Sequence, residues 1–270
     1  MSNTAKTATV PGGAMPISGH FGEMRKRLFK MVIGVAVGTV IAFIFYDPYI
    51  TNFLLWPKPD GVDLQAIEVM ETISVLFTVS LMCGIIIAMP YILYQLFAFI
   101  KPALTDKEKR YVYMAVPAIA GLFLLGVAFT YFIALPPALN FLMGFAPAEV
   151  LVAPQYKNYI SIVTRMLLVM GICFELPLLF MVLASFGVIK KGFLGKWLKI
   201  WIIIAFILAA IITPTMDPIN QSIIAGALIV LYLASIWLVD LAAGGRERRL
   251  KKEAAAELAY AKAHPEEDDY

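Results

Sequence analysis

The most constraining feature of this chain is a series of apolar runs, each close to the length that crosses a lipid bilayer. A transmembrane helix needs roughly 20 apolar residues, because each residue adds about 1.5 Å across a hydrocarbon layer about 30 Å thick. Hydrophobic residues make up 61% of the 270, which is more than one soluble core could hide from water. The sequence therefore predicts an all-α, multi-pass membrane protein. The six runs interpreted as spans cover residues 29–46, 72–94, 112–135, 162–187, 198–212 and 219–239.

Charge is unevenly divided among the segments that connect these runs. Lys and Arg gather before the first run and after the second, fourth and sixth, and six crossings place all of these segments on one side of the membrane. The opposite segments carry only Lys58, Lys157 and Arg165, together with most of the acidic residues. Because loops rich in Lys and Arg stay in the cytoplasm, we expect both termini to be cytoplasmic.

The chain divides into three regions. Residues 1–19 are rich in Ala, Gly, Thr, Ser and Pro without a hydrophobic period, and we expect a disordered lead there. Residues 20–241 form the predicted six-helix membrane domain, and residues 242–270 a cytoplasmic tail that starts as a basic, Ala-rich helical stretch. The two long outer segments, 47–71 and 136–161, are expected to fold against the helix ends.

The fifth and sixth runs are predicted to be short helices. The fifth has about 15 residues before Thr213-Pro214, which at about 1.5 Å each falls short of the hydrocarbon layer. The sixth begins with polar Asn220-Gln221-Ser222. Two short neighbouring helices would thin the bilayer or admit water, and the alternative is ordinary helices whose ends snorkel through Lys199 and Asp240.

Glu175 lies near the middle of the fourth run, where an ionised side chain costs roughly 3 kcal/mol. Pro177 lacks an amide hydrogen and so frees the Cys173 carbonyl one turn back, which adds a second polar group at this depth. Two interpretations are open, a functional polar pocket and a structural hydrogen bond between helices. A secondary transporter with Glu175 as its coupling carboxylate is the alternative function, although the sequence shows no inverted repeat.

Enzymatic chemistry finds no support in the sequence. Both histidines, His20 and His264, fall outside the spans, which leaves no Ser-His pair at membrane depth. Cys83 and Cys173 lie inside apolar runs and are interpreted as small buried side chains. No metal-ligand cluster or phosphate-binding loop is present. We therefore expect no catalytic residue, metal or cofactor, and no nucleic-acid partner.

Several motifs in order resemble the TatC family of twin-arginine translocase subunits, over nearly everything from residue 20 to about 241. Phe21, Gly22 and Met24 depart from the more usual aliphatic residues of the first motif. The motifs are His20-Phe21-Gly22-Glu23-Met24-Arg25-Lys26-Arg27, Pro90-Tyr91-Ile92-Leu93-Tyr94-Gln95 with Phe99 and Pro102-Ala103-Leu104, Glu108-Lys109-Arg110, Phe174-Glu175-Leu176-Pro177, Thr213-Pro214, Asp217-Pro218 and Asn220-Gln221.

The resemblance implies a receptor that binds Arg-Arg signal peptides of folded export substrates at the cytoplasmic face of a prokaryotic inner membrane. It implies single-span partners of the TatA and TatB kind, an oligomeric complex and use of the proton-motive force. Glu108 and Phe99 would bind the signal peptide, with Glu23 and Arg25 nearby. A carboxylate suits this role because it accepts the planar guanidinium fork with two hydrogen bonds.

The resemblance also implies roles for four further residues. Glu175 and Gln221 would be intramembrane polar groups that contact partner helices. Asp217 would lie with Gln221 at the outer end of the fifth and sixth spans, and Pro57 in the first outer loop. From its composition alone, the loop at 95–111 would be interpreted as an ordinary cytoplasmic loop whose basic residues fix the orientation of the neighbouring helices.

Overall fold

The computed structural model describes residues 17–100, 106–144, 153–185, 187–214 and 217–263, and its regular elements are helical. A single isolated bridge, between Gln65 and Gln155, is the only β pairing in these ranges. The elements are α1 (Ile17–Ile44), η1 (Tyr46–Ile50), α2 (Thr51–Leu55), α3 (Glu71–Ile100), α4 (Asp106–Phe129), η3 (Thr130–Ala134), α5 (Leu135–Gly144), α6 (Tyr156–Phe174), α7 (Leu176–Ser185), α8 (Phe193–Lys196), α9 (Leu198–Ile212) and α10 (Pro218–Ala263).

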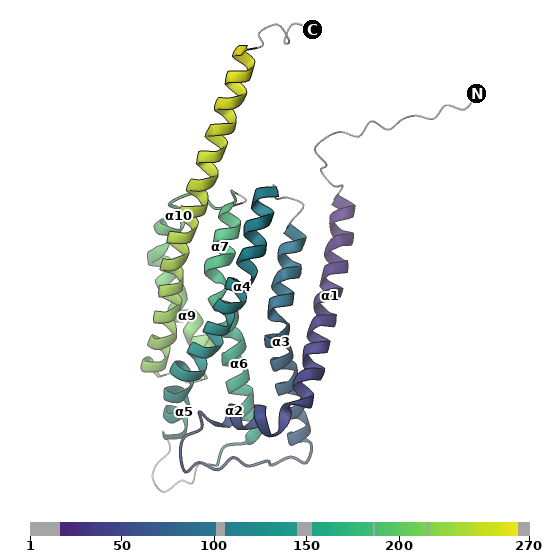
Figure 1. Cartoon of the computed structure of the whole chain (residues 1–270). Coiled ribbons are helices and arrows are strands. Elements are labelled where there is room, and N and C mark those ends of the chain that lie inside the picture. The colour runs from purple at the N-terminus through teal and green to yellow at the C-terminus, as the bar shows by residue number, and fades with distance from the viewer. Residues whose placement is uncertain (1–16, 101–105, 145–152, 186, 215–216, 264–270) are drawn as a thin grey trace, which may run out of the picture.

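The helices run side by side as a bundle (Figure 1). Five helical segments of the described chain are long and apolar enough to cross a membrane, and α9 is apolar but only 15 residues long. The prediction of an all-α, multi-pass membrane protein is therefore confirmed, and so is the short fifth run with its bounds. The five segments are Gly22–Ile44, Glu71–Leu96, Ile119–Gly144, Tyr156–Ser185 and Pro218–Tyr260.

The prediction of a short sixth helix is wrong, because α10 continues for 46 residues to Ala263. Gly244 and Gly245 do not stop it, since the Ala-, Glu-, Lys- and Arg-rich sequence beyond them consists of strong helix formers. Helix α10 projects well beyond the other helices at the end of the bundle where α1 begins (Figure 1). We call this end the termini end. Helix α1 begins at Ile17, so the last three residues of the expected lead are helical, and residues 1–16 lie outside the described part.

The opposite end of the bundle, which we call the cap end, is covered by η1, α2 and the chain that follows them to residue 70 (Figure 1). Leu54 of α2 is only 1% exposed and joins the main core. The Tyr131 hydroxyl donates to the Phe53 carbonyl at 2.6 Å, and the Tyr159 hydroxyl donates to the Leu54 carbonyl at 3.0 Å. The described part of the outer segments thus folds against the helix ends, as expected.

Helices α1 and α3 approach each other closely at a pair of glycines. A Cβ atom on Gly38 would lie 2.5 Å from the Gly84 carbonyl oxygen, so only glycine fits there without a backbone shift. Small residues allow such contact between helices in lipid, where packing rather than hydrophobicity drives association. Most of the large apolar side chains of α1 are exposed.

Candidate functional site

A polar network joins α1 to α3 at the termini end. Arg27 donates from Nε and Nη2 to one oxygen of Glu23, at 3.0 and 2.6 Å, and from Nη1 to Oε1 of Gln95 at 3.4 Å. Gln95 is buried. Glu23 is therefore already paired within the chain, whereas Arg25 is exposed. The sequence reasoning named Arg25 and missed Arg27, although the i to i+4 spacing of Glu23 and Arg27 is the signal of such a helical pair.

Phe99 and Glu108 fall on neighbouring helices at the same end of the bundle. Phe99 belongs to the last turn of α3, which ends at Ile100, and Glu108 to the first turn of α4, which begins at Asp106. The side chains of both residues lie outside the described part of the structure. The connection is shorter than the expected loop at 95–111, because helices extend into it from both sides.

Glu175 marks a break in the fourth run. Its backbone amide donates a hydrogen bond to the Ile172 carbonyl at 3.0 Å, which ends α6. Helix α7 starts at the next residue. The side chain lies beside the backbone of Phe123 in α4, and its Oε1 is buried without a hydrogen-bond partner among the described residues. Pro177, in the first turn of α7, is buried and donates no hydrogen bond.

The contact between α4 and α6 beside Glu175 is close. A Cβ on Gly171 would meet the Phe123 ring at 2.6 Å, and a Cβ on Gly126 would meet the Phe174 ring at 2.7 Å. The carboxyl group is therefore held between two helices that small residues bring together. Because this oxygen is buried within the chain, a donor from another molecule reaches it only after a local rearrangement.

Asp217 caps α10 at the cap end. Its Oδ2 accepts the Asn220 amide at 2.8 Å, and both carboxylate oxygens accept the Asn220 side chain at 2.8 and 2.7 Å. Pro218 follows at the first helical position, where a missing amide hydrogen costs nothing. Asp217 is buried, so the structure gives it a role in starting the helix.

Gln221 and Pro57 also lie toward the cap end, on different elements. Gln221 donates from Nε2 to the Phe206 carbonyl of α9 at 3.0 Å, which joins α10 to α9. Pro57 is buried directly after α2. The structure therefore places Gln221 and Glu175 on separate helices with separate surroundings, rather than in one polar group.

No cluster of three or more potential metal ligands occurs among the residues that the structure describes. Comparison with known proteins then decides the family. The chain matches the family model described as Sec-independent protein translocase protein (TatC) over residues 19–226. The chain belongs to the TatC family. Membership confirms the resemblance seen in the sequence, makes the chain a protein translocase component rather than an enzyme, and leaves no role for the secondary-transporter alternative.

The curated relatives include bacterial and chloroplast TatC proteins. TatC of Aquifex aeolicus is 39% identical over 236 residues, which cover 84% of this chain and 96% of that protein. TatC of Desulforapulum autotrophicum is 35% identical over 245 residues, covering 90% of each chain. The chloroplastic TATC of Pisum sativum is 31% identical over 232 residues, covering 84% of this chain and 65% of that protein.

Two solved TatC structures share the fold. A crystal structure of the twin arginine translocase receptor TatC is 38% identical, with a TM-score of 0.70, and the match covers 83% of this chain and 99% of that one. A second, of the receptor in DDM, is 39% identical with a TM-score of 0.72, covering 81% and 98%. The TatC family model ends at residue 226, so most of the long α10 lies beyond it.

Proposed function

We propose that this TatC protein is the receptor subunit of a twin-arginine translocase, which binds Arg-Arg signal peptides of folded proteins at its termini end. The observation that carries the proposal is the convergence of the family's motifs at that end. The first and second motifs together supply the network of Glu23, Arg27 and Gln95, and the end of α3 and the start of α4 carry Phe99 and Glu108.

The termini end is proposed to face the cytoplasm of a prokaryote, across the inner membrane. Six crossings, with α9 counted as the fifth, return α10 to the end where α1 begins, and the arrangement in Figure 1 supports this. The basic sequences 25–30, 107–110, 190–199 and 246–252 all belong to this end. Lys and Arg concentrate on the cytoplasmic side of membrane proteins.

Within this site, Glu108 is proposed as the main acceptor of a signal-peptide guanidinium, and Phe99 as an apolar contact beside it. Arg27 already occupies Glu23, so an incoming guanidinium would have to displace Arg27 to bind there. We therefore assign Glu23 to shaping the end of α1, and exposed Arg25 to the rim of the site. An arginine fork makes two parallel hydrogen bonds to a carboxylate and a lysine does not, which gives the site its preference.

Partner subunits of the TatA and TatB kind are proposed to pack against the membrane-facing helices in an oligomeric, proton-motive-force-driven complex. The unpartnered Oε1 of Glu175 supports a polar contact with a partner helix that forms when this buried oxygen becomes exposed, because unpaired polar groups inside a bilayer are costly. Gln221, Asp217 and Pro57 are proposed to shape the surface that partners meet toward the cap end, and lipid covers the remaining apolar faces.

The test compares binding of two signal peptides, one with Arg-Arg and one with Lys-Lys, to the full-length protein in detergent. We expect the wild type to prefer Arg-Arg, and Glu108→Gln to lose at least about tenfold in affinity for it, because one bidentate ion pair is removed. Glu247→Gln, on an exposed carboxylate of α10, is the matched control and should bind like the wild type. Equal binding of both peptides by the wild type would refute the receptor assignment.

A further inference from the structure

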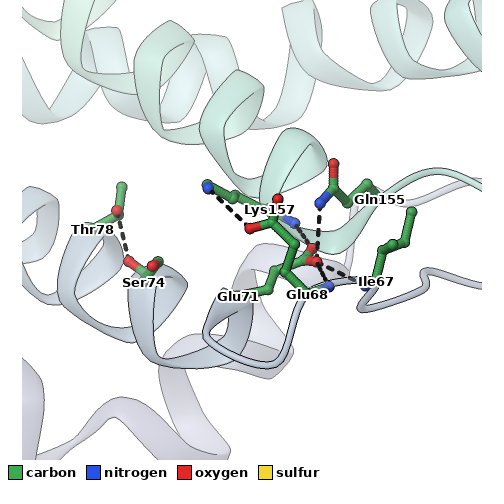
Figure 2. Close-up of polar contacts among 7 residues, drawn as sticks. All are labelled: Ile67, Glu68, Glu71, Ser74, Thr78, Gln155 and Lys157. Atoms are coloured by element: carbon green, nitrogen blue, oxygen red, sulfur yellow. Dashed lines mark hydrogen bonds and ion pairs between the residues drawn. The ribbon is translucent and has the colours of Figure 1, made fainter.

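Glu71 is the first residue of α3 and is completely buried, with 0% of its surface exposed. Its carboxylate accepts four hydrogen bonds from N–H donors (Figure 2). Oε2 accepts the amides of Ile67 and Glu68, at 2.8 and 3.2 Å, and the side-chain amide of Gln155 at 3.0 Å. Oε1 accepts the amide of Lys157 at 2.7 Å. One side chain thus satisfies donors from two segments that are distant in sequence.

These two segments also pair directly through their backbones. The Gln65 amide donates to the Pro154 carbonyl at 3.1 Å, and the Tyr156 amide donates to the Gln65 carbonyl at 2.9 Å. We call the assembly of Gln65–Glu71 with Pro154–Lys157 the clasp. Hydrogen bonds to an ionised acceptor are about twice as strong as neutral ones, so the buried carboxylate is the strongest single element of the clasp.

A second carboxylate in the clasp provides a natural comparison. Glu68 forms an ion pair with Lys157 at 3.7 Å, and the two side chains are 62% and 48% exposed. Exposed pairs of this kind contribute little, since solvent screens them and ordering two long side chains costs entropy. The closure of the clasp therefore depends on Glu71 rather than on the visible salt bridge.

The clasp is continuous with the contacts that hold α2. The hydroxyl groups of Tyr156 and Tyr46 lie 3.2 Å apart, and Tyr159 bonds the Leu54 carbonyl one turn further along α6. Opening the clasp would displace the start of α6, and with it the support beneath α2 and the buried Pro57 that follows.

We propose that Glu71 is a positioning residue that locks the two outer segments into one closed cap, which export requires and signal-peptide binding does not. The link to export rests on the proposed function, whereas the closed arrangement of the cap rests on the hydrogen bonds described above. A closed cap holds the outer ends of α3 and α6 in a constant arrangement, and a partner helix that packs beside them needs a constant surface.

The experiment uses full-length Glu71→Gln, with Glu68→Gln as the matched control. Hydrogen exchange and peptide binding are measured in lipid nanodiscs, and export is measured in energised, sealed membrane vesicles that also contain the partner subunits. The amide has one acceptor oxygen in place of two and directs its own N–H groups at the remaining donors. Hydrogen exchange of the Ile67, Glu68 and Lys157 amides should accelerate at least about tenfold in Glu71→Gln and remain unchanged in Glu68→Gln. Export of a twin-arginine substrate should fall by about tenfold, while affinity for the Arg-Arg peptide stays within about twofold of the wild type.

A rescue distinguishes positioning from general damage. Gln65→Cys with Gln155→Cys, added to Glu71→Gln, places two thiols at the positions that the isolated parallel bridge pairs, where a disulfide would close the clasp covalently. Oxidation should restore export and reduction should abolish it again. Unchanged exchange in Glu71→Gln, or faster exchange with full export, would overturn the proposal. Failure of the wild type to prefer the Arg-Arg peptide would instead refute the proposed function and leave the exchange result standing.

Discussion

At the cap end, buried side chains from α2, α3, η3, α5, α6, α9 and α10 pack into one continuous core. At the termini end, the side chains that the structure describes form two smaller clusters, one among α3, α4 and α7 and the other among α7, α8, α9 and α10. Local stability follows the density of buried contacts. On the side chains that the structure describes, we therefore expect the bundle to keep its shape at the cap end and to rearrange more readily at the termini end, where the signal peptide is proposed to bind.

Polar contacts follow the same division. Cap-end tyrosines and Glu71 satisfy backbone groups of segments far away in the chain. At the termini end, Tyr232 donates to the Leu194 carbonyl at 2.9 Å, and the Gly192 amide donates to Oδ1 of Asp240 at 2.9 Å in an exposed position. Trp201 stacks on Tyr232 with ring centroids 4.6 Å apart. These contacts join neighbouring helices without linking the two clusters.

The largest expected difference between the two ends is the stability lost when a buried leucine is replaced by alanine. Leu135 is 0% exposed within the cap-end core, and Leu93 is 8% exposed within the cluster of α3, α4 and α7. We expect Leu135→Ala to lower the free energy of unfolding by about 3 kcal/mol and Leu93→Ala by about half as much, because a small cluster relaxes into the cavity. Equilibrium unfolding in mixed micelles measures both, and equal losses would break the comparison.

A smaller effect is expected at the tyrosine hydroxyls. Replacing Tyr131 and Tyr159 together with Phe removes two hydrogen bonds to carbonyls of α2, which should cost about 2 kcal/mol in total. Tyr232→Phe removes one hydrogen bond, to the Leu194 carbonyl, and should cost about 1 kcal/mol. Hydrogen exchange should show the double variant exposing α2 alone; exchange spreading into α9 would contradict the separation of the two ends.

The smallest effect concerns the two ion pairs. Glu23 and Arg27 are only 23% and 20% exposed and also engage Gln95, so Glu23→Gln should cost about 0.5 to 1 kcal/mol. Glu68→Gln should change stability by less than about 0.3 kcal/mol, because its pair with Lys157 is exposed. Thermal unfolding at low and high salt measures the difference. A larger loss of stability in Glu68→Gln than in Glu23→Gln would show that the exposed ion pair is the stronger one and would contradict the comparison.

Local sequence signals predicted the elements whose causes are local. The bounds of α9 follow from an apolar run that ends at Thr213-Pro214. The fourth run was predicted as one span, whereas the structure divides it at Glu175, two residues before Pro177. The polar start of the sixth run at Asn220-Gln221-Ser222 predicted a short helix, and the helical stretch expected in the tail was treated as separate, whereas the two form one continuous helix. The family's motifs led to the candidate site residues, whereas composition alone described their loop as an ordinary anchor.

Contacts between distant segments were not predictable in the same way. Glu71 was one of several acidic residues of the outer segments until the fold brought Gln155 and Lys157 to it, across 84 and 86 positions of sequence. Asp217 was expected only to lie at the outer end of the fifth and sixth spans, and the structure shows that it caps its own helix through Asn220. Pairing of this kind depends on how helices pack, which one sequence without its fold does not reveal.

The 46 residues of α10 span roughly 70 Å at about 1.5 Å per residue, more than twice the thickness of the hydrocarbon layer. The part of α10 beyond the bundle is therefore a stiff lever arm. The hydrogen bond from the Gly192 amide to Asp240 anchors α10 close to the point where this arm leaves the bundle. A rotation of about 10° at that point would swing Ala263 through about 6 Å. Small shifts inside the bilayer would thus be magnified into a displacement in the surrounding water that a fluorophore on the lever could report.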